Sequence, residues 1–425
     1  MADKKMPEWF RLDNAATIFP GQNTGAWSNI FRFCVELKEN IDPAVLETAL
    51  KTVMPRFPGF DVMIKRGLFW YYFEKNPNTA PDVCPDISNP CHRVKFNENK
   101  RFLFRVYYHG GRLSVDTYHA ITDGHGAAVF TCTLAAEYLR LRGADIPAGG
   151  FVLDLSEKPS AEEIEDSFRK NANSRGKLKR GGRFVYHAKG TKLPRHMLSI
   201  TSGIVDFDKL HSLTKPLGVT VTEYLAAILL DIHIRKQRAE KRKQKEVCIQ
   251  IPVDLRRAFN SSTMRNFTLC LRVVVDPNLG EYTFEELLNQ VALQLRLAND
   301  PKKLNAMMTA NMGIERNPFL KAMPLPVKNI GIGISFLITG EQTTTSLLTN
   351  LGKVTLPAEM EPYVEKLMFM PGPGMRNGAR CGVTTYGNKL VVTFADLYEE
   401  TDIEREFFTF LVRNGVHVKI ESNRN

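Results

Sequence analysis

A histidine, an aspartate and a glycine occur together at His119, Asp123 and Gly124, in the pattern His-x-x-x-Asp-Gly. Imidazole titrates at about pH 6.5, so His119 is able to accept a proton at neutral pH and to return it. Asp123 can orient the histidine or anchor a buried cation, and Gly124 allows a turn that a side chain would block. A predicted strand precedes this segment and a predicted helix follows it. This order indicates a reactive residue presented at the end of a strand.

Other roles are compatible with the same residues. His119 can be an ordinary half-buried histidine, and His119, Asp123 and His125 together include the ligand types of a metal site. The neighbouring glycines, and the lack of a further carboxylate or cysteine nearby, argue against a metal. A Ser-His-Asp hydrolase is another alternative. However, the chain contains no Gly-x-Ser-x-Gly elbow, and it lacks the glycine-rich phosphate motifs of nucleotide-binding proteins.

A second polar cluster follows a predicted strand that ends near Pro252. Asp254, Arg256 and Arg257 lie in the turn after it. An arginine in this turn can form a bidentate pair with a buried carboxylate from another segment. The alternative is an arginine exposed to solvent in a surface loop.

Hydrophobic spacing predicts the elements that must position these residues. The expected strands are 30–37, 68–73, 102–108 and 113–118 in the first half, and 197–205, 247–253, 267–275, 329–338, 346–355 and 381–395 in the second. One expected helix begins near Pro43, after an Asp42 cap. The other expected helices cover 126–140, 222–243, 284–298, 302–313 and 402–414. We interpret the repeated glycines of 331–335 as close backbone packing within an apolar strand.

The composition excludes several classes of protein. The chain has 425 residues, of which 43% are hydrophobic and 24% charged, and these ordinary globular values exclude disorder and fibrous repeats. The length indicates two or three domains or one large pseudo-duplicated unit. The seven cysteines are scattered without a Cys-x-x-Cys pair, which argues against a disulfide framework and favours a reducing, cytoplasmic location. No apolar stretch approaches the roughly 20 residues that span a bilayer.

The net charge of +11 has two interpretations, simple solubility or an anionic partner such as a CoA-type phosphate donor, an acidic carrier protein or nucleic acid. Residues 167–205 contribute ten Lys or Arg and no Asp or Glu. We predict a solvated basic linker in this stretch, with a mobile basic flap over a phosphate-bearing ligand as the alternative. In the second case Lys177, Lys179 and Arg180 would bind the phosphates.

The ordered set of motifs resembles a known family. The segment His-Ala-Ile-Thr-Asp-Gly, followed by a helix and then by Pro-Val-Asp-Leu-Arg-Arg-Ala-Phe and Arg-Asn-Phe, is similar to the CoA-dependent acyltransferase superfamily. That superfamily includes chloramphenicol acetyltransferase, plant acyltransferases and the condensation domains of nonribosomal peptide synthetases. The resemblance is greatest to the bacterial alcohol acetyltransferase-like branch, through residues 9–20, 41–60 and 349–357, and it extends from Trp9 to the last helix.

The resemblance implies an α/β fold of two similar chloramphenicol-acetyltransferase-like subdomains, with mixed sheets, helices and an active-site tunnel between them. We expect an N-terminal subdomain over 1–170, a basic linker over 171–195 and a C-terminal subdomain over 196–425. In the family pattern His119 would be the general base in the tunnel. Asp123 would have a structural role, paired with an arginine for which Arg256 is the matching position.

The sequence departs from the family pattern at two places. Tyr118 stands where condensation domains have an additional histidine, which weakens a peptide-synthetase interpretation. The Asp-Phe-Gly-Trp-Gly motif of the plant branch is absent, and Thr-Asn-Leu-Gly-Lys-Val lies near its expected place. Thr349 and Asn350 in that segment are the candidate donors to a reaction oxyanion.

The implied function is an acyltransferase that moves an acyl group, such as acetyl, to a small alcohol or amine. Acyl-CoA would be a co-substrate, with no bound cofactor and no metal. Two alternatives stay open: an enzyme that takes its acyl group from an acyl-carrier protein, and a non-catalytic binding protein on the same fold. Nucleic acid is not an expected partner, because the basic runs lack interleaved aromatic residues.

Overall fold

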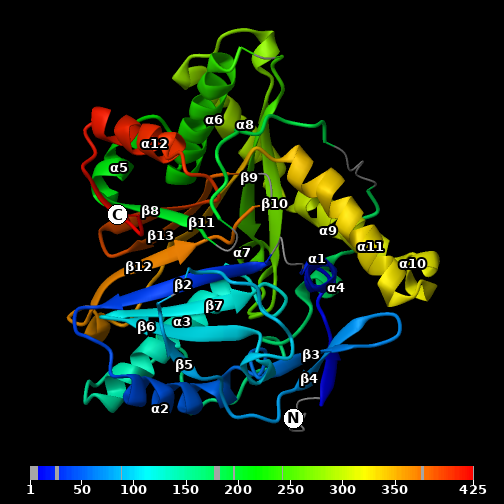
Figure 1. The fold of residues 1–425 in the computed structure, drawn as a ribbon, viewed down its shortest axis with the longest axis vertical. Helices are drawn as coiled ribbons and strands as arrows, with labels where there is room; N and C mark the ends of the chain where they lie inside the picture. The colour runs from blue at the N-terminus through cyan, green and yellow to red at the C-terminus, as the bar shows by residue number, and fades with distance from the viewer. Residues whose placement is uncertain are drawn as a thin grey trace.

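Two large sheets organise the molecule, one in each half (Figure 1). The computed structural model describes residues 8–23, 28–87, 89–176, 182–194, 197–241, 243–374 and 378–424. The first sheet has five strands in the order β12-β2-β7-β6-β5, and the second has seven in the order β10-β9-β11-β13-β14-β8-β15. A smaller sheet of three strands, β1-β4-β3, lies beside the first sheet. The mixed α/β architecture expected from the sequence is confirmed.

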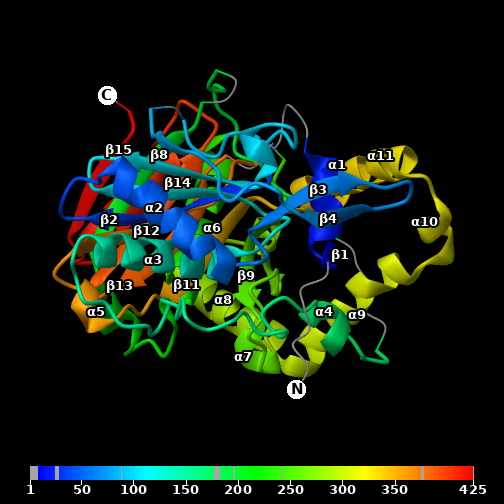
Figure 2. The ribbon, with the colours of Figure 1, turned by 90° about the horizontal axis from the view of Figure 1, so that it is seen from below.

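The strands are β1 (Trp9–Arg11), β2 (Ile30–Leu37), β3 (Val62–Arg66), β4 (Tyr71–Lys75), β5 (Val83–Pro85), β6 (Phe104–His109), β7 (Arg112–Tyr118), β8 (Ser199–Asp206), β9 (Val247–Asp254), β10 (Thr268–Val275), β11 (Ser346–Lys353), β12 (Val364–Met370), β13 (Arg380–Tyr386), β14 (Lys389–Asp396) and β15 (Val418–Ser422). The α-helices are α1 (Phe19–Gln22), α2 (Pro43–Val53), α3 (Gly124–Leu141), α4 (Ser167–Asn171), α5 (Phe207–Thr214), α6 (Val221–Ala239), α7 (Arg256–Phe259), α8 (Phe284–Ala298), α9 (Pro301–Arg316), α10 (Pro318–Ala322), α11 (Leu325–Ser335) and α12 (Asp402–Arg413). In Figure 2, helices α9 to α11 form an arm at one edge of the molecule.

Helix α3 is the central helix of the first half. Residues 126–139 are all buried, because α2 contacts this helix on one side and strands β2 and β7 contact it on another. The sequence predicted a helix with one apolar side, whereas the helix is buried all round. Its polar residues are tolerated because the hydroxyls of Thr131 and Thr133 donate to the carbonyl oxygens of Ala127 and Val129, both at 2.8 Å.

Strand β12 connects the two halves. Although it comes late in the chain, it pairs antiparallel with β2 at the edge of the first sheet. Its residues Leu367 and Phe369 belong to the hydrophobic core of the first half. The expected boundaries 1–170, 171–195 and 196–425 stay a prediction about domains, and this crossover is a feature that they did not include.

The strand predicted over 329–338 is wrong. Residues 325–335 form helix α11, which begins directly after Pro324. The alternation of isoleucine and glycine imitates the period of a strand, but Ile330 and Ile334 are 66% and 54% exposed on the helix surface. A Cβ atom added at Gly331 or Gly333 would meet no atom within 4 Å, so these glycines do not mark close packing.

Two further strand predictions need correction. The aromatic strand expected over 68–73 is β4, which begins at Tyr71, because residues 67–70 form the turn between β3 and β4. The single strand expected over 381–395 is a hairpin of β13 and β14. Gly387 adopts a φ of +55° in its turn, a conformation that glycine reaches without steric cost.

Within the part of the chain that the structure describes, no helix is both long and apolar enough to cross a membrane.

Substitution of Gly382 tests the contact between β13 and the crossover strand β12. A Cβ atom there would lie 2.4 Å from the carbonyl oxygen of Phe369 and 2.7 Å from Cδ of Pro371. We expect Gly382→Ala to lower the free energy of unfolding by about 1–3 kcal/mol, the usual cost of overpacking. Urea denaturation followed by circular dichroism measures this. Gly59→Ala, which meets no atom within 4 Å, is the control and should change stability little.

Candidate active site

His119 lies in the short turn between strand β7 and helix α3. Its backbone N–H donates to the carbonyl oxygen of Asn29 at 2.8 Å, which ties the turn to the start of β2. Helix α3 then begins with Asp123 as its N-cap, whose carboxylate accepts from the N–H of Gly126 at 3.3 Å. The predicted order of strand, turn and helix is therefore present, and it holds His119 between two rigid elements.

The imidazole of His119 makes a hydrogen bond that defines its tautomer. Nδ1 lies 2.9 Å from Oδ1 of Asn266. The amide nitrogen of Asn266 donates to the carbonyl oxygen of His119 at 2.9 Å and to Oδ2 of Asp13 at 3.2 Å, which fixes which end of the amide is oxygen. Because an amide oxygen only accepts, we assign the proton to Nδ1 and the lone pair to Nε2.

Two aromatic rings contact the imidazole. Phe19 of α1 stacks on it with ring centroids 4.9 Å apart, and Phe31 of β2 meets it edge-on at 4.8 Å. Burial lowers the pKa of His119 below the usual 6.5, although the negative charge of Asp123 opposes this effect. The ring is therefore neutral at pH 7, with Nε2 available to accept a proton.

Asp13 is the buried carboxylate behind Asn266. Its Oδ1 accepts from the N–H of Ala16 at 2.7 Å, and its Oδ2 lies 3.5 Å from Nε of Arg265. Burial raises the pKa of Asp13 to about 6, while the charge of Arg265 opposes the rise. A row of polar groups thus runs from the first segment of the chain through Asn266 to the histidine ring.

The carboxylate of Asp123 is paired with the guanidinium of Arg256. The two nitrogens Nη1 and Nη2 donate to Oδ2 and Oδ1 at 3.0 and 2.9 Å, which makes the pair bidentate. The side chains of Arg256 and Asp123 are only 7% and 1% exposed. The N–H of Phe267 also donates to this carboxylate, at 2.8 Å. Burial alone would raise the pKa of Asp123, but the charge and hydrogen bonds of Arg256 outweigh it and hold the pKa below the usual 3.8.

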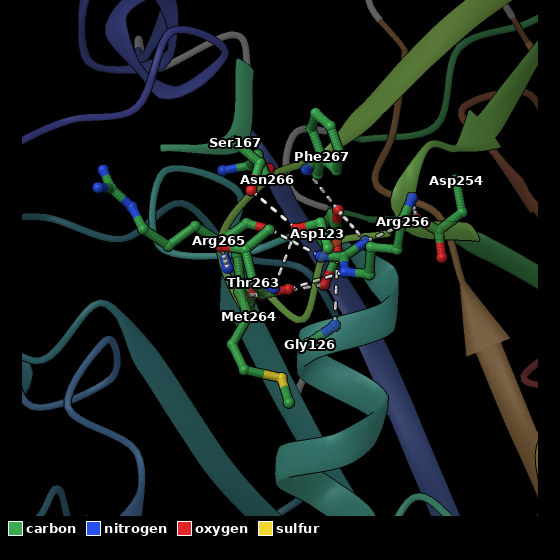
Figure 3. A network of polar contacts seen from close by, with 12 residues as sticks. Asp123, Gly126, Ser167, Asp254, Arg256, Thr263, Met264, Arg265, Asn266 and Phe267 are labelled. Atoms are coloured by element: carbon green, nitrogen blue, oxygen red, sulfur yellow. Dashed lines mark hydrogen bonds and ion pairs between the residues drawn. The ribbon is translucent and has the colours of Figure 1, made fainter. Parts of the chain in front are cut away.

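The same arginine also organises the loop that carries Asn266. Its Nε donates to the carbonyl oxygen of Thr263 at 2.8 Å, and Nη2 donates to that of Arg265 at 2.7 Å. Figure 3 shows this loop wrapped around the start of α3, with Asp123 and Arg256 at its centre. A Cβ atom at Gly126 would lie 2.5 Å from the carbonyl oxygen of Met264, so only glycine fits beneath the loop.

The candidate oxyanion donors lie on strand β11. Asn350 donates through Nδ2 to Oγ1 of Thr222 at 3.0 Å and accepts from the N–H of Gly352 at 2.8 Å, so its amide is already engaged. Leu351 lies against the start of α3, because a Cβ atom at Gly124 would be 2.7 Å from its Cδ2. Thr349 and Asn350 pair with Gly382 and Val383 of β13, and the register of the strand shifts between Asn350 and Lys353.

Two further predictions concern phosphate-binding residues and a metal ligand. Lys177, Lys179 and Arg180, the candidate phosphate-binding residues, lie outside the described part of the chain. His125, considered as a metal ligand, packs against Phe151 with ring centroids 5.1 Å apart. Among the residues that the structure describes, no group of three or more histidine, cysteine or acidic side chains is arranged to hold a metal ion.

Sequence reasoning assigned no role to four side chains around the histidine: Asn266, Asp13, Phe19 and Phe31. Two signals for them were present. Asn266 is the middle residue of Arg-Asn-Phe, and Asp13 and Phe19 belong to the opening segment 9–20 that carries part of the resemblance. Nothing in those segments indicates that they meet at His119.

Solved structures share this fold over almost the whole chain. Polyketide synthase associated protein 5 from Mycobacterium tuberculosis matches with a TM-score of 0.62 and 15% identity, over 96% of this chain and 98% of that one. TRI101 from F. sporotrichioides, solved with coenzyme A and T-2, matches with a TM-score of 0.64 and 13% identity, over 97% and 99% of the two chains. The starter condensation domain of rhizomide synthetase, in complex with C8-CoA, matches with a TM-score of 0.59 and 14% identity, over 96% and 95%.

These comparisons show the fold of CoA-dependent acyltransferases and condensation domains, as the motifs predicted. No protein-family model and no curated protein sequence matches the chain. At 13–15% identity the structural likeness establishes the fold alone.

A matched pair of substitutions separates the buried ion pair from the exposed one on the same guanidinium. Asp123→Asn leaves Arg256 buried without its main counter-charge, so we expect a loss of about 3–5 kcal/mol in the free energy of unfolding at pH 7. Asp254, whose side chain is 44% exposed, also contacts Nη1 of Arg256, at 2.9 Å. Asp254→Asn should cost about 1 kcal/mol or less. Urea denaturation measures both.

The pH dependence of this difference has a definite sign. The lowered pKa of Asp123 means that its contribution is present above the ordinary pKa of 3.8 and is lost as the pH falls through the lower folded value. The stability gap between the wild type and Asp123→Asn should therefore begin to narrow as the pH falls below 3.8 and should close once the pH is below the folded value. Equal losses for Asp123→Asn and Asp254→Asn would contradict this account of the pair.

Proposed function

We propose that this protein is an acyltransferase that moves an acyl group, such as acetyl, from acyl-CoA to a small alcohol or amine, with His119 as the general base. The observation that carries the proposal is the bond between Nδ1 of His119 and Asn266. It leaves a half-buried, neutral imidazole with its Nε2 lone pair unprotonated. The fold shared with TRI101, which was solved with coenzyme A, supports the choice of donor.

In the proposed reaction, the hydroxyl or amine of the acceptor donates a hydrogen bond to Nε2 of His119. The acceptor oxygen or nitrogen attacks the thioester carbonyl as its proton passes to Nε2. The tetrahedral intermediate then collapses, the carbon–sulfur bond breaks, and the imidazolium returns the proton to the departing CoA thiolate. Asn266 still accepts from Nδ1–H in the charged state, and the negative charge of Asp123 favours the imidazolium.

Asp123 and Arg256 are positioning residues in this proposal. Their pair fixes the loop that places Asn266 against the ring and does not itself touch substrate. For the oxyanion, the engagement of the Asn350 amide favours Thr349 as the donor. We also propose a cytoplasmic location, which agrees with seven cysteines that are all free thiols.

Purified protein incubated with a panel of acyl-CoAs and mixed alcohols and amines, with mass-spectrometric detection of acylated products, tests the activity directly. A strong preference for acyl-carrier-protein thioesters over CoA thioesters would favour the carrier-dependent alternative. Binding of these compounds without turnover would favour a non-catalytic protein on the same fold.

Removal of the base should reduce turnover without unfolding the protein. We expect His119→Ala to lower kcat by about a hundredfold or more, since a general base contributes on the order of 10²–10⁴-fold. His125→Gln, six positions along the chain, is the matched control and should retain most of the activity. Circular dichroism confirms that both variants are folded, and wild-type turnover by His119→Ala would refute the assignment.

The role of Asn266 has its own signature in the pH profile. The hydrogen bond from Nδ1 to Asn266 raises the pKa of His119 against the effect of burial, so its loss should lower that pKa further. In the wild type, kcat/KM should fall as the pH decreases, with a midpoint below 6.5, the usual histidine value. For Asn266→Ala we expect kcat to fall by about tenfold to a hundredfold and the midpoint to move further down.

Asn305→Ala provides the control for the loss of a structural amide. Asn305 donates through Nδ2 to the carbonyl oxygen of Asn171 at 2.8 Å, in a part of the molecule distinct from His119. This variant should leave the midpoint of the pH profile unchanged. If Asn266→Ala loses stability but keeps the wild-type profile, Asn266 does not set the tautomer of the base.

A further inference from the structure

A cavity of about 490 Å³ beside strand β3 is lined by basic side chains. We call it the basic pocket, and its lining residues are Asn23, Ile64, Lys65, Arg66, Arg93, Lys95, Phe96, Asn97 and Arg101. Five of these residues are cationic and none is acidic. The volume is in the range of small-molecule sites, about 300–1,000 Å³.

The charge of this pocket is only partly neutralised by the protein. Lys65 and Lys95 pair with Glu74 and Glu98, at 3.2 and 2.7 Å. Arg66, Arg93 and Arg101 make no ion pair with a carboxylate of the described residues. Arg93 instead donates to the side-chain and backbone oxygens of Asn23, at 3.1 and 2.9 Å, which fixes its guanidinium in the wall.

The backbone next to the pocket is held in a rarely occupied conformation. Asn99, Lys100 and Arg101 have consecutive φ values of +51°, +49° and +67°. These values lie in the left-handed region, which residues other than glycine and asparagine seldom adopt. Asn76 and Asn78 hold this segment by donating to the carbonyl oxygen of Lys100, at 3.0 and 3.2 Å. Strain that the surrounding structure maintains in this way is typical of ligand sites.

Two contacts link the basic pocket to the candidate active site. The short helix α1 stacks Phe19 on His119 and is followed directly by Asn23 in the pocket wall. Phe96 contacts the ring of Tyr118, the residue before His119, at 5.7 Å between centroids. The Tyr118 hydroxyl is buried and makes no hydrogen bond within the described residues. These contacts make the pocket wall and the histidine neighbours within the same half of the molecule.

From this arrangement we infer that the basic pocket binds the phosphate groups of a substrate whose reactive end reaches His119. Arginine guanidinium groups without a carboxylate partner, here Arg66, Arg93 and Arg101, are well suited to recognise phosphate, and the two neighbouring lysines add positive charge. The identity of the ligand rests on the proposed acyl transfer: the phosphates belong either to the nucleotide part of the CoA donor or to a phosphorylated acceptor. Both sources present the same chemistry to the pocket.

The decisive variant is Arg66→Gln combined with Lys95→Gln, two exposed residues whose replacement should not disturb folding. The charge-matched control is Lys209→Gln with Arg413→Gln, two exposed cations on α5 and α12. Isothermal titration with adenosine 3′,5′-bisphosphate and with inorganic pyrophosphate measures phosphate binding without any catalysis. We expect the pocket variant to bind at least one probe about tenfold more weakly than the control, the effect of losing one charge-assisted hydrogen bond or more.

Arg101→Gly distinguishes a binding role from a purely structural one. Glycine removes the cation and also relieves the left-handed backbone, so we expect a melting temperature equal to or above that of the wild type together with about tenfold weaker probe binding. Unchanged binding of both probes by Arg101→Gly and by the pocket variant would overturn the inference.

Kinetic arms identify the source of the phosphate. If the donor supplies it, the pocket variant raises KM for CoA thioesters but not for pantetheine thioesters, and increased salt has the same selective effect. If the acceptor supplies it, the variant raises KM only for phosphorylated acceptors. Probe binding by a His119→Ala protein tests the pocket independently of catalysis. If this variant binds the probes and the wild type shows no turnover in any assay, the pocket is supported and the acyltransferase function is refuted.

Discussion

One buried ion pair, Asp123 with Arg256, determines how the two halves of this molecule meet. A carboxylate that caps a buried helix cannot stay ionised without a partner, since its desolvation costs several kcal/mol. The partner comes from 133 positions along the chain, at the end of a strand in the other sheet. Once the pair forms, the guanidinium has further hydrogens to satisfy, and it does so on the carbonyl oxygens of the loop 263–265. The loop that carries Asn266 is thereby fixed against the turn that carries His119.

The electrostatics of His119 follow from that constraint. The imidazole is enclosed by Phe19 and Phe31, which favours its neutral form, while Asn266 and the charge of Asp123 favour the protonated form to a lesser degree. The proposed role of His119 as a general base needs both influences, because such a group must take a proton and give it back. Asp13 extends the arrangement, because its carboxylate holds the amide of Asn266 in the orientation that presents oxygen to the ring. Asp13 accepts a hydrogen bond from the Asn266 amide, and the oxygen of that amide accepts one from His119, so these bonds specify a single orientation of the amide and the ring.

Local patterns in the sequence were enough for much of the fold and for part of the site. The cap at Asp42, the helix after Gly124 and the pairing of Asp123 with an arginine of the 254–257 turn all follow from residue types within a short segment or from the motif set. The contacts of Asn266 with His119 and Asp13 join residues 147 and 253 positions apart, and no local period records such a distance. Strand β12 was not predicted, and its place in the first sheet could not be, since its hydrophobic pattern is the same whichever sheet it joins. The prediction over 329–338 was wrong for another reason. Pro324 and Pro326 favour the start of a helix that includes most of this segment, although isoleucine and glycine alternate there.

The separation of the basic pocket from the histidine is itself a physical requirement. A cluster of cations beside His119 would lower the pKa of the imidazole further, because a positive neighbour disfavours the protonated ring. A base with a very low pKa accepts a proton poorly. Phosphate recognition, in contrast, needs several cations close together in a solvent-accessible cavity. Phe19 contacts the imidazole and Tyr118 contacts Phe96 of the pocket, so aromatic side chains separate the imidazole from the cations within one half of the protein. The left-handed backbone at Arg101 lies on the pocket side of that boundary.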